Sequence, residues 1–207
     1  HTIFQSVTGV QTCALPIWDE PATSPADPGV GAVAETATQG PATGWWALRF
    51  TPRVALADGD TVLLEVSTTE RLWGGRDALL ALVLQAWAEN AGGQGALPQP
   101  PGMVPPWGSG PTALVAQAWL RMALAGQAPR WQEGQEGQEG RPRQQGPAVH
   151  TLPLHTLTAL RPHVASLERM GCRTWGALRA LPRAGVARRV GAGVLRVLDQ
   201  ALGEAPE

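Results

Sequence analysis

The chain has 207 residues, 43% of them hydrophobic, and a formal net charge of −1. This length allows one or two modest cores, which excludes a large multidomain enzyme. The longest nearly apolar run, residues 78–88, is too short for a membrane-spanning helix, which needs about 20 residues. The two cysteines, Cys13 and Cys172, form no CxxC motif and indicate neither a disulfide framework nor a zinc site. We therefore expect a soluble, cytoplasmic protein with unpaired thiols and no membrane partner.

The charges are unevenly distributed along the chain. All 16 cationic residues are Arg, because Lys is absent. Residues 1–149 contain 8 Arg and 13 acidic residues, whereas residues 150–207 contain 8 Arg and 4 acidic residues. The basic character is therefore confined to the C-terminal end.

The N-terminal segment has an unusual sequence. Residues 7–17, VTGVQTCALPI, resemble a translated sequencing-library adapter along their whole length. We interpret residues 1–17 as an adapter-derived artefact, exclude them from the fold and assign Cys13 no redox or catalytic role. The natural coding sequence then begins near Trp18, and whatever preceded it is missing. The alternative is an ordinary short hydrophobic segment.

Strand signals begin after a linker. Residues 18–44 are rich in Pro, Gly, Ala, Thr and Ser without periodicity, which predicts a disordered linker. Two short apolar segments, residues 45–57 and 61–67, flank the sequence Asp-Gly-Asp and predict a β-hairpin.

Two helices are predicted after the hairpin. Residues 74–93 carry apolar residues at helical spacing between pairs of glycines. The apolar residues are Leu79, Leu80, Leu82, Val83 and Trp87. Residues 111–126 predict a second helix with Thr112 as its N-cap. Strands followed by helices on one face predict an α+β layer over residues 45–125, and the QEG repeats within residues 126–149 predict a low-complexity linker.

Residues 150–207 predict an all-α domain of short helices and tight turns. Gly171 ends one helix, Thr174 caps the next, and residues 182–203 add a turn and an amphipathic helix. The inward residues of that last helix are Val194, Leu195, Leu198 and Leu202. This pattern, in which a glycine-bearing turn joins two helices and which occurs twice, is typical of helix-hairpin-helix domains. Such domains expose backbone N–H groups to phosphate oxygens.

The predicted DNA-backbone contacts are the arginines and glycines beside the two turns. They are Arg173, Arg179, Arg183, Arg188, Arg189, Gly171, Gly185 and Gly191. We expect non-specific binding of phosphate at these positions, and the alternative is a solvated helical face. Trp175 is either a packing residue or a platform for base stacking.

Three segments in this order resemble the Y-family (UmuC/DinB-like) translesion DNA polymerases. They are residues 50–75, 108–120 and 152–203. The resemblance is to the later part of the polymerase palm, over residues 45–125, and to the thumb, over residues 150–203. More narrowly, it is to the catalytically impaired ImuB-type proteins of the bacterial mutasome. The last block is the most specific, followed by RLWGG at residues 71–75.

The resemblance also implies where catalytic carboxylates are expected. An active family member places adjacent Asp and Glu before an apolar strand, and an Asp of the first palm strand completes a site for two Mg²⁺ ions. In that register Asp60 matches the Asp, but Thr61 replaces the Glu. Glu65 lies four residues further along, about 13 Å away at strand rise, and we expect it at an edge or facing solvent. The first-strand Asp and the fingers would belong to the missing N-terminus.

We therefore assign no catalytic residue and expect no cofactor, since Mg²⁺ is implied only for active family members. The family also uses a Lys to contact the incoming triphosphate, and this chain contains none. His150, His155 and His163 lack the spacing of a metal site.

The resemblance implies a fragment of a polymerase-like protein that binds DNA during damage-induced mutagenic repair, the SOS response of bacteria, without polymerase activity. Its implied partners are DNA and, in the full-length protein, an error-prone replicative-type polymerase and the sliding clamp. Two alternatives stay open: an active translesion polymerase truncated at its N-terminus, and a helical protein-interaction module without DNA contact. Without its first strand, the incomplete palm is expected to expose an unpaired sheet edge.

Overall fold

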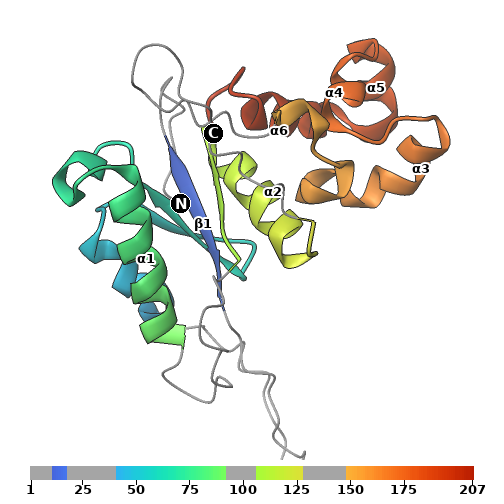
Figure 1. The fold of residues 1–207 in the computed structure, drawn as a ribbon. Coiled ribbons are helices and arrows are strands. Elements are labelled where there is room, and N and C mark those ends of the chain that lie inside the picture. The colour runs from blue at the N-terminus through green and yellow to red at the C-terminus, as the bar shows by residue number, and fades with distance from the viewer. Residues whose placement is uncertain (1–10, 18–40, 92–105, 128–147) are drawn as a thin grey trace, which may run out of the picture. The chain divides into compact units, whose positions relative to one another are not determined.

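The structure is a computed structural model that describes residues 11–17, 41–91, 106–127 and 148–207. The linkers predicted at 18–44 and 126–149 lie almost entirely outside these residues. The chain divides into two compact units, one of residues 1–14 and 106–207 and the other of residues 15–105, and each is described by itself (Figure 1). Residues 106–125, predicted to belong to the same region as the hairpin, are grouped here with the C-terminal helices.

The predicted hairpin forms the strand layer of the unit of residues 15–105. Strands β2 (Val54–Ala57) and β3 (Thr61–Glu65) are antiparallel, with Val54 opposite Leu64 and Ala57 opposite Thr61. The turn between them places Asp58 at φ 54° and Gly59 at φ 78°. Two consecutive left-handed residues are what a tight hairpin turn requires, and the Asp-Gly pair supplies them at low cost.

The segment before β2 differs from the prediction. Residues 45–49, expected as part of a strand, lie in the 3₁₀ helix η1 (Pro41–Arg49). The buried residues here are Ala47 and Phe50, which are three positions apart. That is a helical rather than a strand spacing. The ring of Phe50 packs 5.3 Å from that of Trp73 in the short helix η2 (Glu70–Trp73), which fixes the end of η1.

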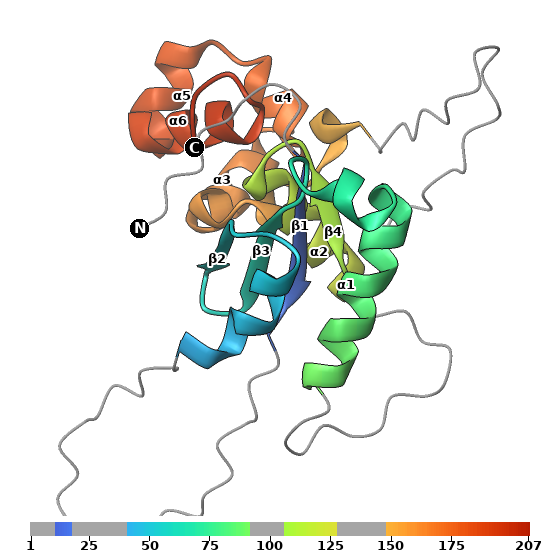
Figure 2. The same cartoon turned by 90° about the vertical axis from the view of Figure 1, so that its left-hand side faces the viewer.

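Helix α1 (Arg76–Ala91) confirms the predicted first helix. Its buried face carries Leu79, Val83 and Trp87, whereas Leu82, predicted to face inward, is 39% exposed. The indole N–H of Trp87 donates to the carbonyl of Pro16 at 2.8 Å, and α1 also contacts η1 and η2 (Figure 2). The helix is thus anchored by one narrow apolar stripe and one buried hydrogen bond.

An additional strand corrects the reading of the N-terminal segment. Residues Thr12–Pro16 form the buried strand β1, which pairs antiparallel with β4 (Gly108–Gly110), and the strand order is β2-β3-β1-β4. The expectation that residues 1–17 lie outside the fold is therefore wrong for residues 12–16, whereas the adapter origin of the segment stays a prediction. Strand β1 lies beside β3 in this order, and β2 is the edge strand on the hairpin side among the described residues. A short apolar run satisfies a strand position whatever its origin.

Helix α2 (Ala113–Leu124) follows β4 closely. A Cβ atom on Gly108 would lie 2.1 Å from the carbonyl oxygen of Ala116, so only glycine fits there. The predicted N-cap is confirmed, because the Thr112 hydroxyl accepts a hydrogen bond from the Val115 amide at 3.2 Å. The same hydroxyl donates to the carbonyl of Ala201 at 3.0 Å, which ties α2 to the C-terminal helices.

The C-terminal segment is helical, as predicted, although its first part consists of 3₁₀ turns. The elements are η3 (Val149–Thr151), η4 (Leu154–Thr156), η5 (Thr158–His163), α3 (Val164–Arg169), α4 (Trp175–Arg179), α5 (Arg183–Val190) and α6 (Ala192–Ala201). One core joins them to α2 and includes Trp119, Leu160 and Leu198. Trp175 is fully buried in this core, so it packs and offers no ring for base stacking.

Together these elements confirm an α+β fold. Within the residues that the structure describes, no helix combines the length and the apolar character needed to cross a membrane. Cys13 and Cys172 are both buried, and the structure joins neither of them in a disulfide.

Candidate functional site

Two glycine-bearing turns join short helices near the C-terminus. Gly171, with φ 81°, lies between α3 and α4, and Gly191, with φ 92°, lies between α5 and α6. Both turns were predicted. Gly185 differs from the prediction because it lies inside α5 instead of in a turn.

The amides of the Gly171 turn are used within the protein. Those of Met170, Gly171 and Cys172 donate to carbonyls of α3 at 2.9 to 3.0 Å. At the start of α4, the amides of Trp175 and Ala177 donate to other protein oxygens at 2.9 and 3.2 Å. An anion would have to displace these hydrogen bonds to reach the backbone amides. Only the side chains of this turn are therefore readily available to bind it.

The Gly191 turn has a different arrangement. The first amides of a helix have no partner within that helix, and α6 begins without a side-chain cap. Gly191, Ala192 and Gly193 are exposed, and a Cβ atom on either glycine would meet no atom within 4 Å. The positive end of the helix dipole is therefore open to solvent, and it suits a phosphate oxygen.

Three exposed arginines flank the open start of α6. Arg188 and Arg189 lie in the last turn of α5, and Arg196 lies three residues after Gly193, one turn along α6. Arg188 Nε donates to the carbonyl of Ala184 at 3.2 Å, and Arg189 Nη1 donates to Met170 Sδ at 3.0 Å. Neither acceptor carries a formal charge, so both guanidinium charges remain. We call this set the α6 turn site; it consists of residues 191–193, at and just before the start of α6, with Arg188, Arg189 and Arg196.

Arg196 was not among the arginines predicted to contact DNA. The only signal was its spacing, since a residue three positions after Gly193 shares its face only if a helix begins at the glycine turn. The structure supplies that starting point.

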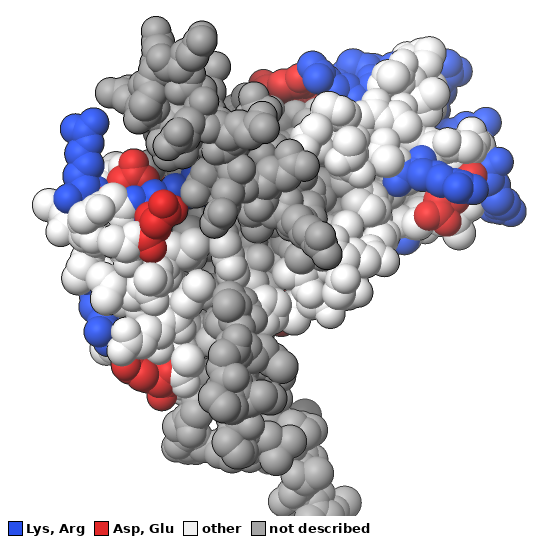
Figure 3. All heavy atoms as spheres, in the orientation of Figure 1, with Lys and Arg blue, Asp and Glu red and all other residues white. Residues whose placement is uncertain are grey.

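The other predicted arginines have different surroundings. Arg183 forms a bidentate ion pair with Asp199, with Nη1–Oδ1 at 3.0 Å and Nη2–Oδ2 at 2.5 Å. Arg179 forms an ion pair with Glu204. The Asp199 carboxylate raises the pKa of Arg183 above its ordinary value. Arg173 is exposed and lies in the Gly171 turn. In Figure 3, basic side chains predominate over the C-terminal helices, and a few acidic side chains lie beside them.

The carboxylates of the hairpin are also engaged. Asp60 is exposed and its Oδ1 accepts a hydrogen bond from the Thr61 hydroxyl at 2.7 Å. Glu65 is buried, in contrast to the exposed position expected for it. Arg53 forms an ion pair with its Oε2 at 3.0 Å, and the Ser67 hydroxyl donates to Oε1. These partners offset the cost of burying the charge.

These residues do not fit the two-magnesium site that the resemblance implies for active polymerases. Strand β1, Thr12–Pro16, contains no carboxylate, and Glu65 is held by an arginine. Among the described residues, no group of three His, Cys, Asp or Glu side chains is placed to hold a metal ion. A divalent ion bound for phosphoryl transfer needs several oxygen ligands at one point.

Comparisons with known proteins agree with the resemblance at a coarse level. No protein-family model matches the chain. The chain is 32% identical over 163 residues to Protein ImuB from each of two strains of Caulobacter vibrioides. The aligned region covers 78% of this chain and 31% of each relative, so the chain spans less than a third of the length of the curated relatives it matches.

Proposed function

Starting from this similarity to ImuB, we propose that the chain is part of a Y-family-polymerase-like protein that binds the DNA backbone in damage-associated mutagenesis without synthesising DNA. The α6 turn site carries the proposal. It combines the start of α6, which has no side-chain cap, two glycines that leave room for a ligand, and three exposed guanidinium groups. Backbone amides and arginines together are the usual donors to DNA phosphates.

The binding is to phosphates and not to bases. Single-stranded nucleic acid is commonly held by exposed aromatic rings on which bases stack. The described segment 148–207 has one aromatic residue, Trp175, and it is fully buried. Duplex DNA of any sequence is therefore the expected ligand, with an affinity that falls steeply as salt rises.

In this proposal, residues 45–125 correspond to part of a polymerase palm, and residues 150–203 correspond to a thumb. The absence of polymerase activity is supported by the hairpin carboxylates, since Asp60 lies in a turn and Glu65 is paired with Arg53. The polymerase partner, the sliding clamp and the bacterial cytoplasm are carried over from the resemblance as properties of the whole protein.

The proposal is tested by titrating the full chain into a short fluorescein-labelled duplex of mixed sequence at several salt concentrations. Three arginines at phosphates predict a log–log salt slope of about −3. Duplexes of unrelated sequence should compete equally. Absent binding, or binding that is insensitive to salt, would favour the protein-interaction alternative. Primer extension that is abolished by Asp60→Ala would instead favour the polymerase alternative.

A further inference from the structure

The two glycine turns are joined by a contact between Arg189 and Met170, and we propose that Met170 is an oxidation site that controls DNA binding at the α6 turn site. The reactant that oxidises Met170 is a hydroperoxide. The inference rests on the proposed function, because its readout is affinity for DNA.

Met170 is accessible to a small oxidant. It is 43% exposed and immediately precedes Gly171 in the turn after α3. Met122, in contrast, packs against the core of the C-terminal helices, and Met103 lies outside the described residues. Met170 is therefore the more reactive of the two described methionines, since oxidation of methionine follows exposure of its sulfur.

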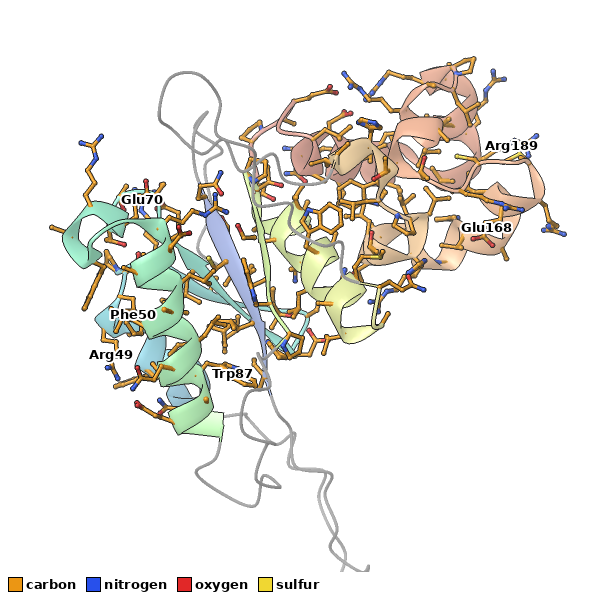
Figure 4. All side chains as sticks on the ribbon, viewed as in Figure 1. Arg49, Phe50, Glu70, Trp87, Glu168 and Arg189 are labelled. Atoms are coloured by element: carbon orange, nitrogen blue, oxygen red, sulfur yellow. The ribbon has the colours of Figure 1, made fainter. Side chains whose placement is uncertain are left out.

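The sulfur of Met170 holds an arginine of the proposed site. Arg189 Nη1 donates to Met170 Sδ at 3.0 Å, so a residue of the first turn contacts the guanidinium that flanks the second. Figure 4 shows Arg189 at the end of the helical region where α3 and Glu168 lie. A thioether is a weak hydrogen-bond acceptor, so a phosphate oxygen displaces it from Arg189 at little cost.

Oxidation changes the competition between residue 170 and a phosphate oxygen for the Arg189 guanidinium. The sulfur lone pair attacks one oxygen of hydrogen peroxide, and the S–O bond forms as the O–O bond breaks. The departing hydroxide takes the proton of the sulfur-bound OH group and leaves as water, so that the sulfoxide remains. Sulfur is oxidised by two electrons, and the peroxide is reduced by the same two. The sulfoxide oxygen is a strong acceptor that faces the Arg189 guanidinium, so the arginine stays with residue 170 and is less available to phosphate.

The cysteines offer a slower competing reaction. Cys13 and Cys172 are both buried, and burial raises the pKa of the Cys172 thiol. Less thiolate means slower reaction with peroxide. Mild treatment should therefore modify Met170 first.

The experiment treats the full chain with dilute hydrogen peroxide, quantifies each methionine sulfoxide by peptide mass spectrometry, and repeats the duplex titration. We expect Met170 to oxidise before Met122 and the affinity to fall roughly fivefold, the effect of losing one charged contact at an exposed site. Reduction by methionine sulfoxide reductases should restore the affinity. The matched control is Met170→Leu, which keeps the side-chain volume and should bind DNA equally before and after peroxide.

The outcomes separate this inference from the function on which it rests. If the untreated chain binds no duplex, both the proposed function and the role of Met170 are overturned. If it binds but Met170 sulfoxide leaves the affinity unchanged, or Met170→Leu loses as much affinity under peroxide as the unmodified chain, only the regulatory role is overturned. Faster oxidation of Met122 than of Met170 also overturns it.

Discussion

The turns at Gly171 and Gly191 look alike in sequence and in backbone conformation, yet only one of them is open to a ligand. Each has a glycine at positive φ followed by a helix. After Gly171, the amides donate to α3 carbonyls and to the Thr174 hydroxyl. After Gly191, α6 begins without a side-chain cap. Binding capacity therefore depends on which amides remain unsatisfied and not on the glycine itself.

The arginines divide in the same way. Arg179 and Arg183 are paired with acidic residues, whereas Arg188 and Arg189 contact a carbonyl and a thioether. A paired arginine gives less to an incoming phosphate, because the existing carboxylate must first be displaced. The count of arginines thus overstates the positive charge that is available for DNA.

The largest effect is expected from reversing charge at the α6 turn site. Arg188→Glu combined with Arg189→Glu should weaken duplex binding at least about a hundredfold, because two charge-assisted contacts are lost and two repulsions are added. The measurement is the anisotropy titration at constant salt. Arg173→Glu, in the Gly171 turn, is the matched control and should have a much smaller effect. Equal losses of duplex affinity in the double variant and in Arg173→Glu would mean that the two turns contribute equally to DNA binding.

A carboxylate placed in the first turn of α6 should compete with phosphate directly. Gly193→Asp is expected to lower duplex affinity about tenfold, while stabilising the fold by about 0.3–1 kcal/mol through the helix dipole. Binding titration and thermal unfolding measure the two effects on one variant. Gly193→Asn has nearly the same size without the charge, and it should lose less affinity. An Asp variant that binds as tightly as the unmodified chain would argue against phosphate at this turn.

Gly171 should matter for stability and not for binding. Gly171→Ala forces a side chain into the left-handed region at φ 81°, which costs about 1 kcal/mol of unfolding free energy. Gly185→Ala is the contrasting variant, since it lies inside α5 with open space around it and should stabilise the protein by about 0.5–1 kcal/mol. Urea denaturation gives both values. A loss of DNA affinity in Gly171→Ala, with the fold intact, would mean that the Gly171 turn is also part of the DNA-binding site.

Removing an acidic competitor should have a smaller, opposite effect. Asp199→Asn breaks the ion pair with Arg183 and makes that guanidinium available, so duplex affinity should rise about threefold. Asp77→Asn, in α1 of the other unit, controls for the change in net charge. If both variants bind equally more tightly, long-range charge and not the release of Arg183 explains the gain.

The smallest effect concerns Glu207. Burial raises the pKa of its carboxyl group, and hydrogen bonds from the Ala113 and Leu114 amides only partly offset this. A carboxyl group with a raised pKa binds its proton more tightly in the folded state. Its contribution to stability is therefore present below its ordinary pKa and is lost as pH rises through the raised value.

Glu207→Gln should remove this dependence. Between about pH 4 and 7, the unmodified chain should lose a few tenths of a kcal/mol relative to the variant, as measured by paired thermal melts. A difference between the two proteins that stays constant over this range would mean that the carboxyl group titrates at its ordinary pKa.

The sequence by itself determined the local elements of this protein. The Asp-Gly turn, the apolar stripe of α1 and the caps at Thr112 and Thr174 were all predicted, because each depends on neighbours within a few residues. The α+β class followed from the order of these elements.

Only the tertiary structure decided which polar groups are already satisfied. Glu65 was expected at an edge or facing solvent, whereas the folded hairpin places Arg53 beside it. Residues 12–16 were expected to lie outside the fold, whereas they pair with β4. The Gly171 turn looked equivalent to the Gly191 turn, and Arg196 was not recognised at all. Hydrogen bonds and ion pairs join residues that are distant in the chain, so the remaining capacity of a site to bind phosphate is settled only when the chain has folded.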